Sequence, residues 1–83
     1  MELKELLTQL PPSFAYKMAH TAKLRMEVMG TRWLAGYYST YEDNYIVEGG
    51  FQETLTEAVA ALISEAKQHG LKLPYTGGAK LKV

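Results

Sequence analysis

The sequence predicts an α+β fold in which an N-terminal and a C-terminal helix flank a three-stranded antiparallel meander (α-β-β-β-α). Apolar residues recur at helical spacing near both ends of the chain, and side chains alternate with a period of two between them. Short gaps rich in glycine or acidic residues separate the alternating stretches, and strands joined so closely usually pair as neighbours. With 83 residues, we expect a single domain over residues 1–74 and a flexible tail over residues 75–83.

The first predicted element is a short helix over residues 2–10. Leu3, Leu6, Leu7 and Leu10 fall at helical spacing and form one apolar stripe. The pair Pro11-Pro12 cannot continue a helix and ends it. Because so short a helix is marginal in water, its leucines are expected to dock on the sheet or on a partner.

The next segment, residues 14–28, alternates between apolar and polar side chains, as does a strand with one buried face. The pattern is clearest over residues 22–29. Residues 13–20 are also compatible with a helix, because alanine and methionine there have high helix propensity, so both alternatives stay open. Three methionines of this region are interpreted as ordinary core residues: Met18, Met26 and Met29.

Two further strands are predicted over residues 32–41 and 45–48. The first is rich in aromatic residues, and neither of its faces is clearly polar. Residues 42–44, Glu-Asp-Asn, form a typical turn between the two strands, and Gly49-Gly50 ends the second. An extra strand at either end of the meander is compatible with the pattern.

The C-terminal helix has the most distinctive signals. Thr54 begins a capping box, and Gly70 stands where a left-handed residue ends a helix, so that Leu71 folds back on the last turn. Pro74 then prevents the helix from resuming. The predicted core stripe consists of Leu55, Val59, Leu62, Ile63 and Ala66. In the tail, lysines alternate with Leu81 and Val83, which would also suit an edge strand.

Composition narrows the class of protein. The formal net charge is zero, which disfavours binding to nucleic acid or to anionic membranes through bulk charge. The chain has no cysteine, which excludes disulfides and cysteine-ligated zinc and favours the cytoplasm. The start does not resemble a signal peptide, and the longest apolar run, residues 58–63, is far too short to span a bilayer. We therefore expect no membrane association.

No catalytic or metal-binding constellation is visible. His20 and His69 are the only histidines, and neither stands in a metal-binding motif. Gly49-Gly50 lacks the lysine and the spacing of a phosphate-binding loop. We predict a non-enzymatic protein with no cofactor and no small-molecule substrate. Catalysis would require His20, a carboxylate and a tyrosine to converge in one pocket.

Basic and aromatic residues of the predicted sheet form a candidate binding surface. Such a surface is typical of single-stranded nucleic-acid platforms and equally of protein interfaces, which are enriched in tyrosine and arginine. Zero net charge, and Glu27 on the same face, favour a protein partner or a homodimer, with nucleic acid as the alternative. The candidate residues are Lys17, Lys23, Arg25, Arg32, Tyr37, Tyr38, Tyr41 and Tyr45.

Four segments between Trp33 and Pro74 carry a family resemblance: residues 33–35, 48–50, 54–59 and 70–74. They resemble small phage and prophage proteins with an α-β-β-β-α sandwich and, more distantly, HicB-type antitoxins. The predicted N-terminal helix fits the phage proteins better, because HicB-type proteins usually begin with a strand. The first resemblance implies a non-catalytic accessory or regulatory protein. We therefore expect a small protein-interaction module, with a HicB-like antitoxin as a further alternative.

Overall fold

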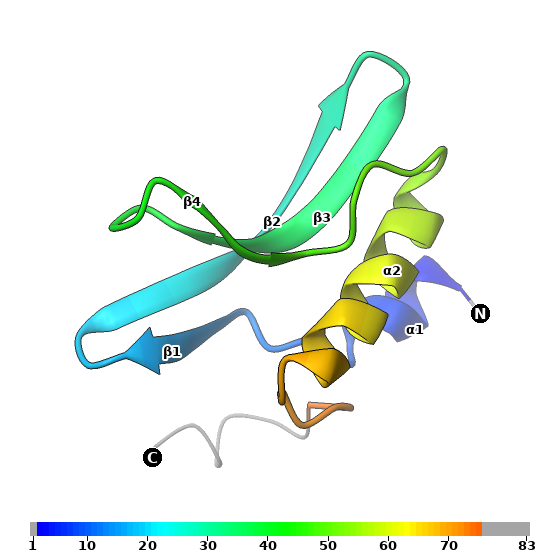
Figure 1. The fold of residues 1–83 in the computed structure, drawn as a ribbon. Coiled ribbons are helices and arrows are strands. Elements are labelled where there is room, and N and C mark those ends of the chain that lie inside the picture. The colour runs from blue at the N-terminus through cyan, green and yellow to red at the C-terminus, as the bar shows by residue number, and fades with distance from the viewer. Residues whose placement is uncertain (1, 76–83) are drawn as a thin grey trace.

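The computed structural model describes residues 2–75, which form a four-stranded antiparallel sheet and two helices. The strands follow one another in the sheet in chain order, β1-β2-β3-β4. Helix α2 crosses one face of the curled sheet, packing on β3 and β4, and α1 packs against α2 (Figure 1). The elements are α1 (Leu3–Leu7), β1 (Ser13–Lys17), β2 (His20–Met29), β3 (Arg32–Ser39), β4 (Asn44–Glu48) and α2 (Leu55–Gln68).

The α+β class is confirmed, but the prediction of three strands is wrong. Residues 13–20, left open between helix and strand, form β1 and a two-residue turn, Met18-Ala19, that leads into β2. Across a two-residue turn an odd-numbered residue shares a face with an even-numbered one, as Lys17 does with His20. The bulge between Ala15 and Lys17 adds one residue and restores the parity, so that Phe14 pairs with Ala22. The alternation therefore runs through the turn unbroken and hides the reversal of the chain.

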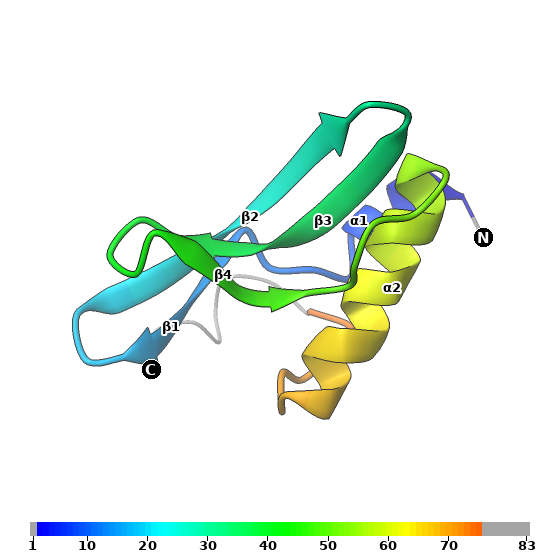
Figure 2. The same ribbon diagram turned by 45° about the horizontal axis from the view of Figure 1, so that its top comes forward.

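The core lies between the helices and one face of the sheet (Figure 2). Tyr37, Val59 and Leu62 are fully buried in it, and the predicted leucines of α1 pack against the same cluster. The Tyr37 hydroxyl donates a hydrogen bond to the Pro11 carbonyl oxygen at 2.7 Å, and its ring meets Phe14 edge-on at 4.8 Å. Tyr37 thus joins the α1–β1 connection to the centre of the sheet.

The N-cap predicted at Thr54 and the helix end predicted at Gly70 are confirmed, but within residues 2–75 no hydrogen bond returns from the Glu57 side chain to the Thr54 amide, so the predicted capping box is only half formed. The Thr54 hydroxyl accepts a hydrogen bond from the Glu57 amide at 3.1 Å. Gly70 has a positive φ of 93°, and the Leu71 amide returns to the Ala66 carbonyl oxygen at 3.0 Å. Leu71 consequently packs against the core, as the predicted helix end requires.

A glycine allows α2 to approach the end of β4 closely. A β-carbon on Gly49 would lie 2.7 Å from the Ala61 carbonyl carbon and 2.7 Å from the Leu62 nitrogen. Because these are backbone atoms of a helix, no side-chain rotation relieves the contact. The loop between β4 and α2 therefore requires glycine at this position for steric reasons.

Two further expectations concern the C-terminal tail and the possibility of a membrane-spanning helix. In the predicted tail, the Tyr75 amide donates a hydrogen bond to the Gln9 carbonyl oxygen at 2.7 Å, while residues 76–83 lie outside the described residues. Within residues 2–75, no helix is long and apolar enough to cross a membrane.

The buried phenol of Tyr37 is expected to make stability sensitive to alkaline pH. Burial raises the pKa of this group above its ordinary value, so the folded state binds the proton more tightly than the unfolded state does. The free energy of unfolding should therefore be unaffected below about pH 10 and fall above it, by up to about 1.4 kcal/mol per pH unit for this group. Urea unfolding across this range should show a shallower decline for Tyr37→Phe, and equal slopes would contradict the assignment.

Candidate functional site

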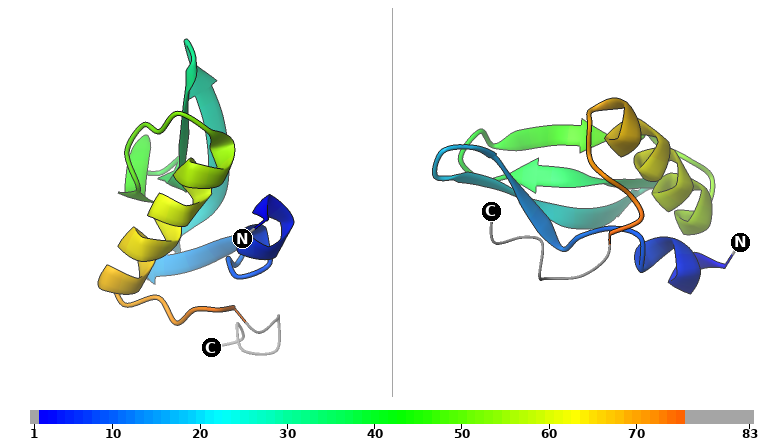
Figure 3. Two further views of the ribbon diagram at one scale, coloured as in Figure 1. Left: turned by 90° about the vertical axis from the view of Figure 1, so that its right-hand side faces the viewer. Right: turned by 90° about the horizontal axis from the view of Figure 1, so that it is seen from below.

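The face of the sheet opposite the helices is the candidate functional surface, and we call it the helix-free face. Figure 3 shows both helices gathered on the other side of the strands. Cross-strand partners share a face, so the register of β2, β3 and β4 assigns its members. They are Lys23, Arg25, Glu27, Met29, Arg32, Leu34, Gly36, Tyr38, Tyr45 and Glu48.

The centre of the helix-free face is a cluster of charged and aromatic groups. The Arg25 guanidinium lies 4.3 Å from the centroid of the Tyr38 ring and 3.4 Å from a Glu27 carboxylate oxygen. The Tyr38 hydroxyl donates a hydrogen bond to Asp43, which raises the pKa of this phenol. One face of the Tyr38 ring is thus already covered by a neighbouring cation.

Tyr45 lies across the middle of the sheet because Gly36 leaves room for it. A β-carbon on Gly36 would stand 2.7 Å from the Tyr45 ring and 2.7 Å from the Val47 carbonyl oxygen. The Tyr45 ring meets Tyr38 edge-on, with centroids 5.3 Å apart. Burial, followed by the negative charge of Glu27, raises the pKa of the Tyr45 phenol. A flat aromatic platform for stacking ligands is therefore not exposed here.

The acidic groups of this region are engaged with neighbours, whereas two cations are not. Glu27 pairs with Arg25, Asp43 accepts from Tyr38, and a Glu48 carboxylate oxygen accepts from the Gly50 amide at 2.7 Å. Within residues 2–75, neither Lys23 nor Arg32 has a hydrogen bond or ion pair through its side chain. The charge left without a partner on this face is therefore positive.

The tip of the β2–β3 hairpin, which extends beyond α2 in Figure 1, forms an apolar end of the helix-free face. Met29 is 62% exposed and Phe51 is 43% exposed, and together with Arg32 they line a shallow hollow of about 220 Å³. Leu34 is buried on the same face, outside the main core. The interpretation of Met18, Met26 and Met29 as core is wrong, because all of them are exposed.

The structure brings together five of the eight predicted surface residues and separates three. The five on the helix-free face are Lys23, Arg25, Arg32, Tyr38 and Tyr45. Tyr37 is a core residue, since its side of β3 is the one that α2 covers. The alternation predicted Lys17 on the same face as Lys23. A bulge between Ala15 and Lys17 shifts the register, so Lys17 pairs with His20 and lies on the other face. Tyr41 follows β3 and stacks on His20, with centroids 3.5 Å apart.

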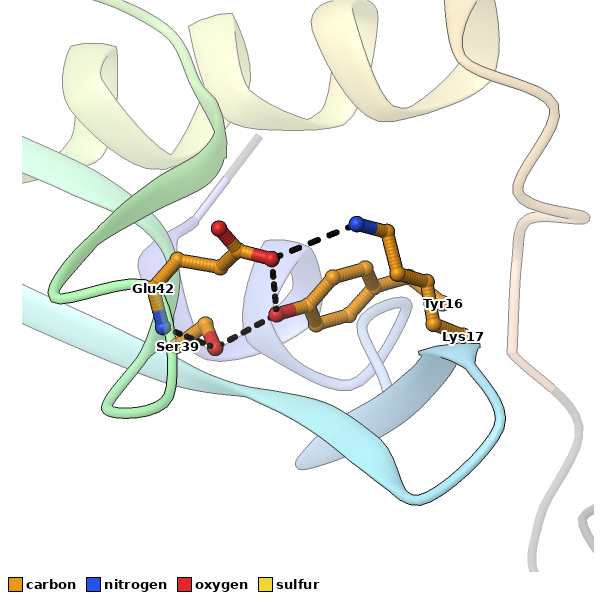
Figure 4. A network of polar contacts seen from close by, with 4 residues as sticks. All are labelled: Tyr16, Lys17, Ser39 and Glu42. Carbon is orange, nitrogen blue, oxygen red and sulfur yellow. Dashed lines mark hydrogen bonds and ion pairs between the residues drawn. The ribbon is translucent and has the colours of Figure 1, made fainter.

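Lys17 belongs to a polar cluster that joins the β1–β2 hairpin to the end of β3 (Figure 4). The hydroxyls of Tyr16 and Ser39 share a hydrogen bond at 2.6 Å, and the Tyr16 hydroxyl also donates to Glu42 at 3.4 Å. The Lys17 ammonium lies 3.5 Å from the same Glu42 oxygen. These contacts tie the β1–β2 hairpin to the turn after β3.

This cluster does place His20 near a carboxylate and a tyrosine, the convergence named above as a condition for catalysis. The Tyr16 and His20 rings are 5.8 Å apart. Ser39, however, is fully buried, and its oxygen accepts from the Glu42 amide at 3.2 Å. Within the described part of the chain, no hydrogen bond joins His20 to Ser39 or Glu42. The arrangement thus lacks the nucleophile–base contact of a hydrolase.

Comparison of the chain with family models, curated proteins and solved structures finds no match. Among residues 2–75, no three histidine, aspartate or glutamate side chains are grouped so as to hold a metal ion. The geometry of the helix-free face therefore carries the argument about function.

Proposed function

We propose that the chain is a small non-catalytic protein-interaction module that binds its partner through the helix-free face. One observation carries the proposal: the helix-free face combines paired charges, tyrosines and exposed apolar side chains. Protein interfaces combine these features, with tyrosine, arginine and methionine enriched. Roles as a phage accessory protein or a HicB-like antitoxin stay predictions from the sequence resemblance.

Binding of single-stranded nucleic acid is the second candidate, favoured by Arg25 over the Tyr38 ring and by Lys23 and Arg32, whose side chains have no partner within residues 2–75. Two features weigh against it. Arg25 already covers one face of the Tyr38 ring and pairs with Glu27, so that ring face is not open for a base to stack on. Lys23 and Arg32 are far apart. Arg32 pairs with Met29 of β2, which lies six residues after Lys23, or roughly 20 Å along an extended strand. Two isolated cations at that spacing do not form a continuous track for a phosphate backbone.

An affinity-capture experiment tests the proposal. The immobilised chain should retain a defined set of proteins from cell lysate, and the double variant Arg25→Ala/Tyr38→Ala should lose them. Lys67→Ala, a substitution at an exposed position of α2, serves as the matched control and should retain the same proteins. If neither the double variant nor Arg32→Glu alters the set of captured proteins, the helix-free face is not the interface.

The nucleic-acid alternative makes a different prediction. Short single-stranded DNA and RNA would bind at low salt, with affinity falling steeply as salt rises, and Lys23→Ala/Arg25→Ala would weaken binding. We expect instead that fluorescence anisotropy of labelled oligonucleotides detects no binding that depends on these two residues. A salt-sensitive complex lost in this double variant would reassign the surface to nucleic acid.

A further inference from the structure

The apolar end of the helix-free face combines two exposed side chains with one cation. Met29 and Phe51 come from different parts of the chain, yet both border the hollow that Arg32 also lines. Single exposed apolar residues are common on protein surfaces, but two that border one hollow form a small apolar patch on which a partner side chain can dock. The volume of about 220 Å³ is below the range of typical small-molecule sites, about 300–1,000 Å³, and suits one inserted side chain.

Arg32 is the charged group of this hollow. Within residues 2–75 its guanidinium has no ion pair, and Glu27 and Glu48 are held by Arg25 and by the Gly50 amide. A guanidinium binds a carboxylate with two parallel hydrogen bonds, and an apolar side chain docked beside the pair would strengthen it by excluding water. The hollow therefore has the chemistry to receive a carboxylate beside an apolar group.

The backbone around the hollow is fixed by hydrogen bonds. Arg32 pairs directly with Met29 across the tight turn at Gly30, which has a positive φ of 64°. Trp33 and Gln52 exchange two backbone hydrogen bonds, each 2.8 Å long. These bonds hold Phe51, which directly precedes Gln52, close to the hairpin. A site on a fixed backbone loses less conformational entropy on binding.

We propose that this hollow, which we call the Arg32 site, binds a protein segment that carries a large apolar side chain next to an aspartate or glutamate. The apolar side chain inserts between Met29 and Phe51, and the neighbouring carboxylate pairs with Arg32. The inference rests on the proposed function and adds the chemistry of the partner to it. Charge complementarity selects an acidic segment, because the charged group of the hollow is the Arg32 guanidinium, which has no ion pair within residues 2–75.

A displayed library of random linear peptides tests the Arg32 site with the full chain as the target. Wild-type protein should enrich peptides in which an acidic residue adjoins leucine, methionine or phenylalanine. In a synthetic copy of an enriched peptide, replacing the acid by its amide should weaken binding about tenfold or more in fluorescence anisotropy. Arg32→Glu should instead enrich basic peptides, and Lys67→Glu, on α2, should leave the wild-type preference unchanged.

Other outcomes separate the two proposals. Two outcomes would overturn the Arg32 site and leave the proposed function intact. In the first, the enriched peptides show no preference for acidic residues. In the second, binding is unaffected by Arg32→Gln but is lost in Arg25→Ala/Tyr38→Ala. Binding insensitive to both sets of substitutions, or no enrichment at all, would count against both. Concentration-dependent dimerisation lost in Arg32→Glu would replace the acidic partner by a second copy of this chain.

Discussion

Replacing Tyr37 by alanine is expected to lower the free energy of unfolding by about 3–5 kcal/mol, as for other large aromatic residues removed from a core. Tyr37 is fully buried, packs edge-on against Phe14 and donates a hydrogen bond to the Pro11 carbonyl oxygen. A domain of 83 residues has in total about 4–12 kcal/mol of stability, so the loss is a large part of it. Urea or thermal unfolding followed by circular dichroism measures it.

The adjacent tyrosine provides a matched control. Tyr38 points to the helix-free face, where its hydroxyl bonds Asp43 and its ring faces Arg25. Its replacement by alanine removes surface contacts and leaves the core filled, so we expect a much smaller loss of stability than for Tyr37→Ala. Similar losses for the two variants would contradict the assignment of Tyr37 to the core and of Tyr38 to the surface.

The second large effect is expected for Gly49→Ala, which should cost about 3 kcal/mol, at the upper end of the range for overpacking. The added β-carbon would meet the backbone of α2 at Ala61 and Leu62, so either the helix or the loop must move. Denaturant unfolding measures the loss. Ala61→Gly in the same chain should not restore stability, because the backbone atoms of the contact remain.

Gly50→Ala is the control for this substitution, since it changes the neighbouring residue in the same loop. Gly50 has a positive φ of 82°, but a β-carbon there would meet nothing closer than the flexible Gln52 side chain at 4.0 Å. Only backbone strain of about 1–2 kcal/mol is expected. A smaller loss for Gly49→Ala than for Gly50→Ala would show that α2 is not held rigidly against the end of β4.

The parts of the fold that depend on local signals were predictable. Thr54 and Gly70 act on backbone groups within one helical turn, so sequence alone identifies both ends of α2. The turn at Met18-Ala19 was missed, because neither residue is typical of a tight turn and the alternation continues across it. Ala19 adopts a positive φ of 70°, a conformation that its residue type does not announce.

The candidate site was only partly predictable, because the face of a side chain depends on where distant elements pack. Nothing in β3 distinguishes Tyr37 from Tyr38 until α2 covers one side of the sheet. A one-residue bulge transferred Lys17 to the opposite face from the one its numbering indicated. Phe51 joins Met29 and Arg32 through a bridge between Trp33 and Gln52, and the only signal in the sequence was an aromatic residue directly after Gly49-Gly50.

The chain-order arrangement of the strands also has a kinetic consequence. Every strand pairs with the next one along the chain, so the sheet consists of hairpins of low contact order, whose closure costs little loop entropy. The contacts between α1 and α2 join segments near opposite ends of the described chain and form only after most of it has been synthesised. In a chain emerging from the ribosome, the strands can therefore pair before α2 is available, and the apolar side of the sheet stays uncovered until this helix docks.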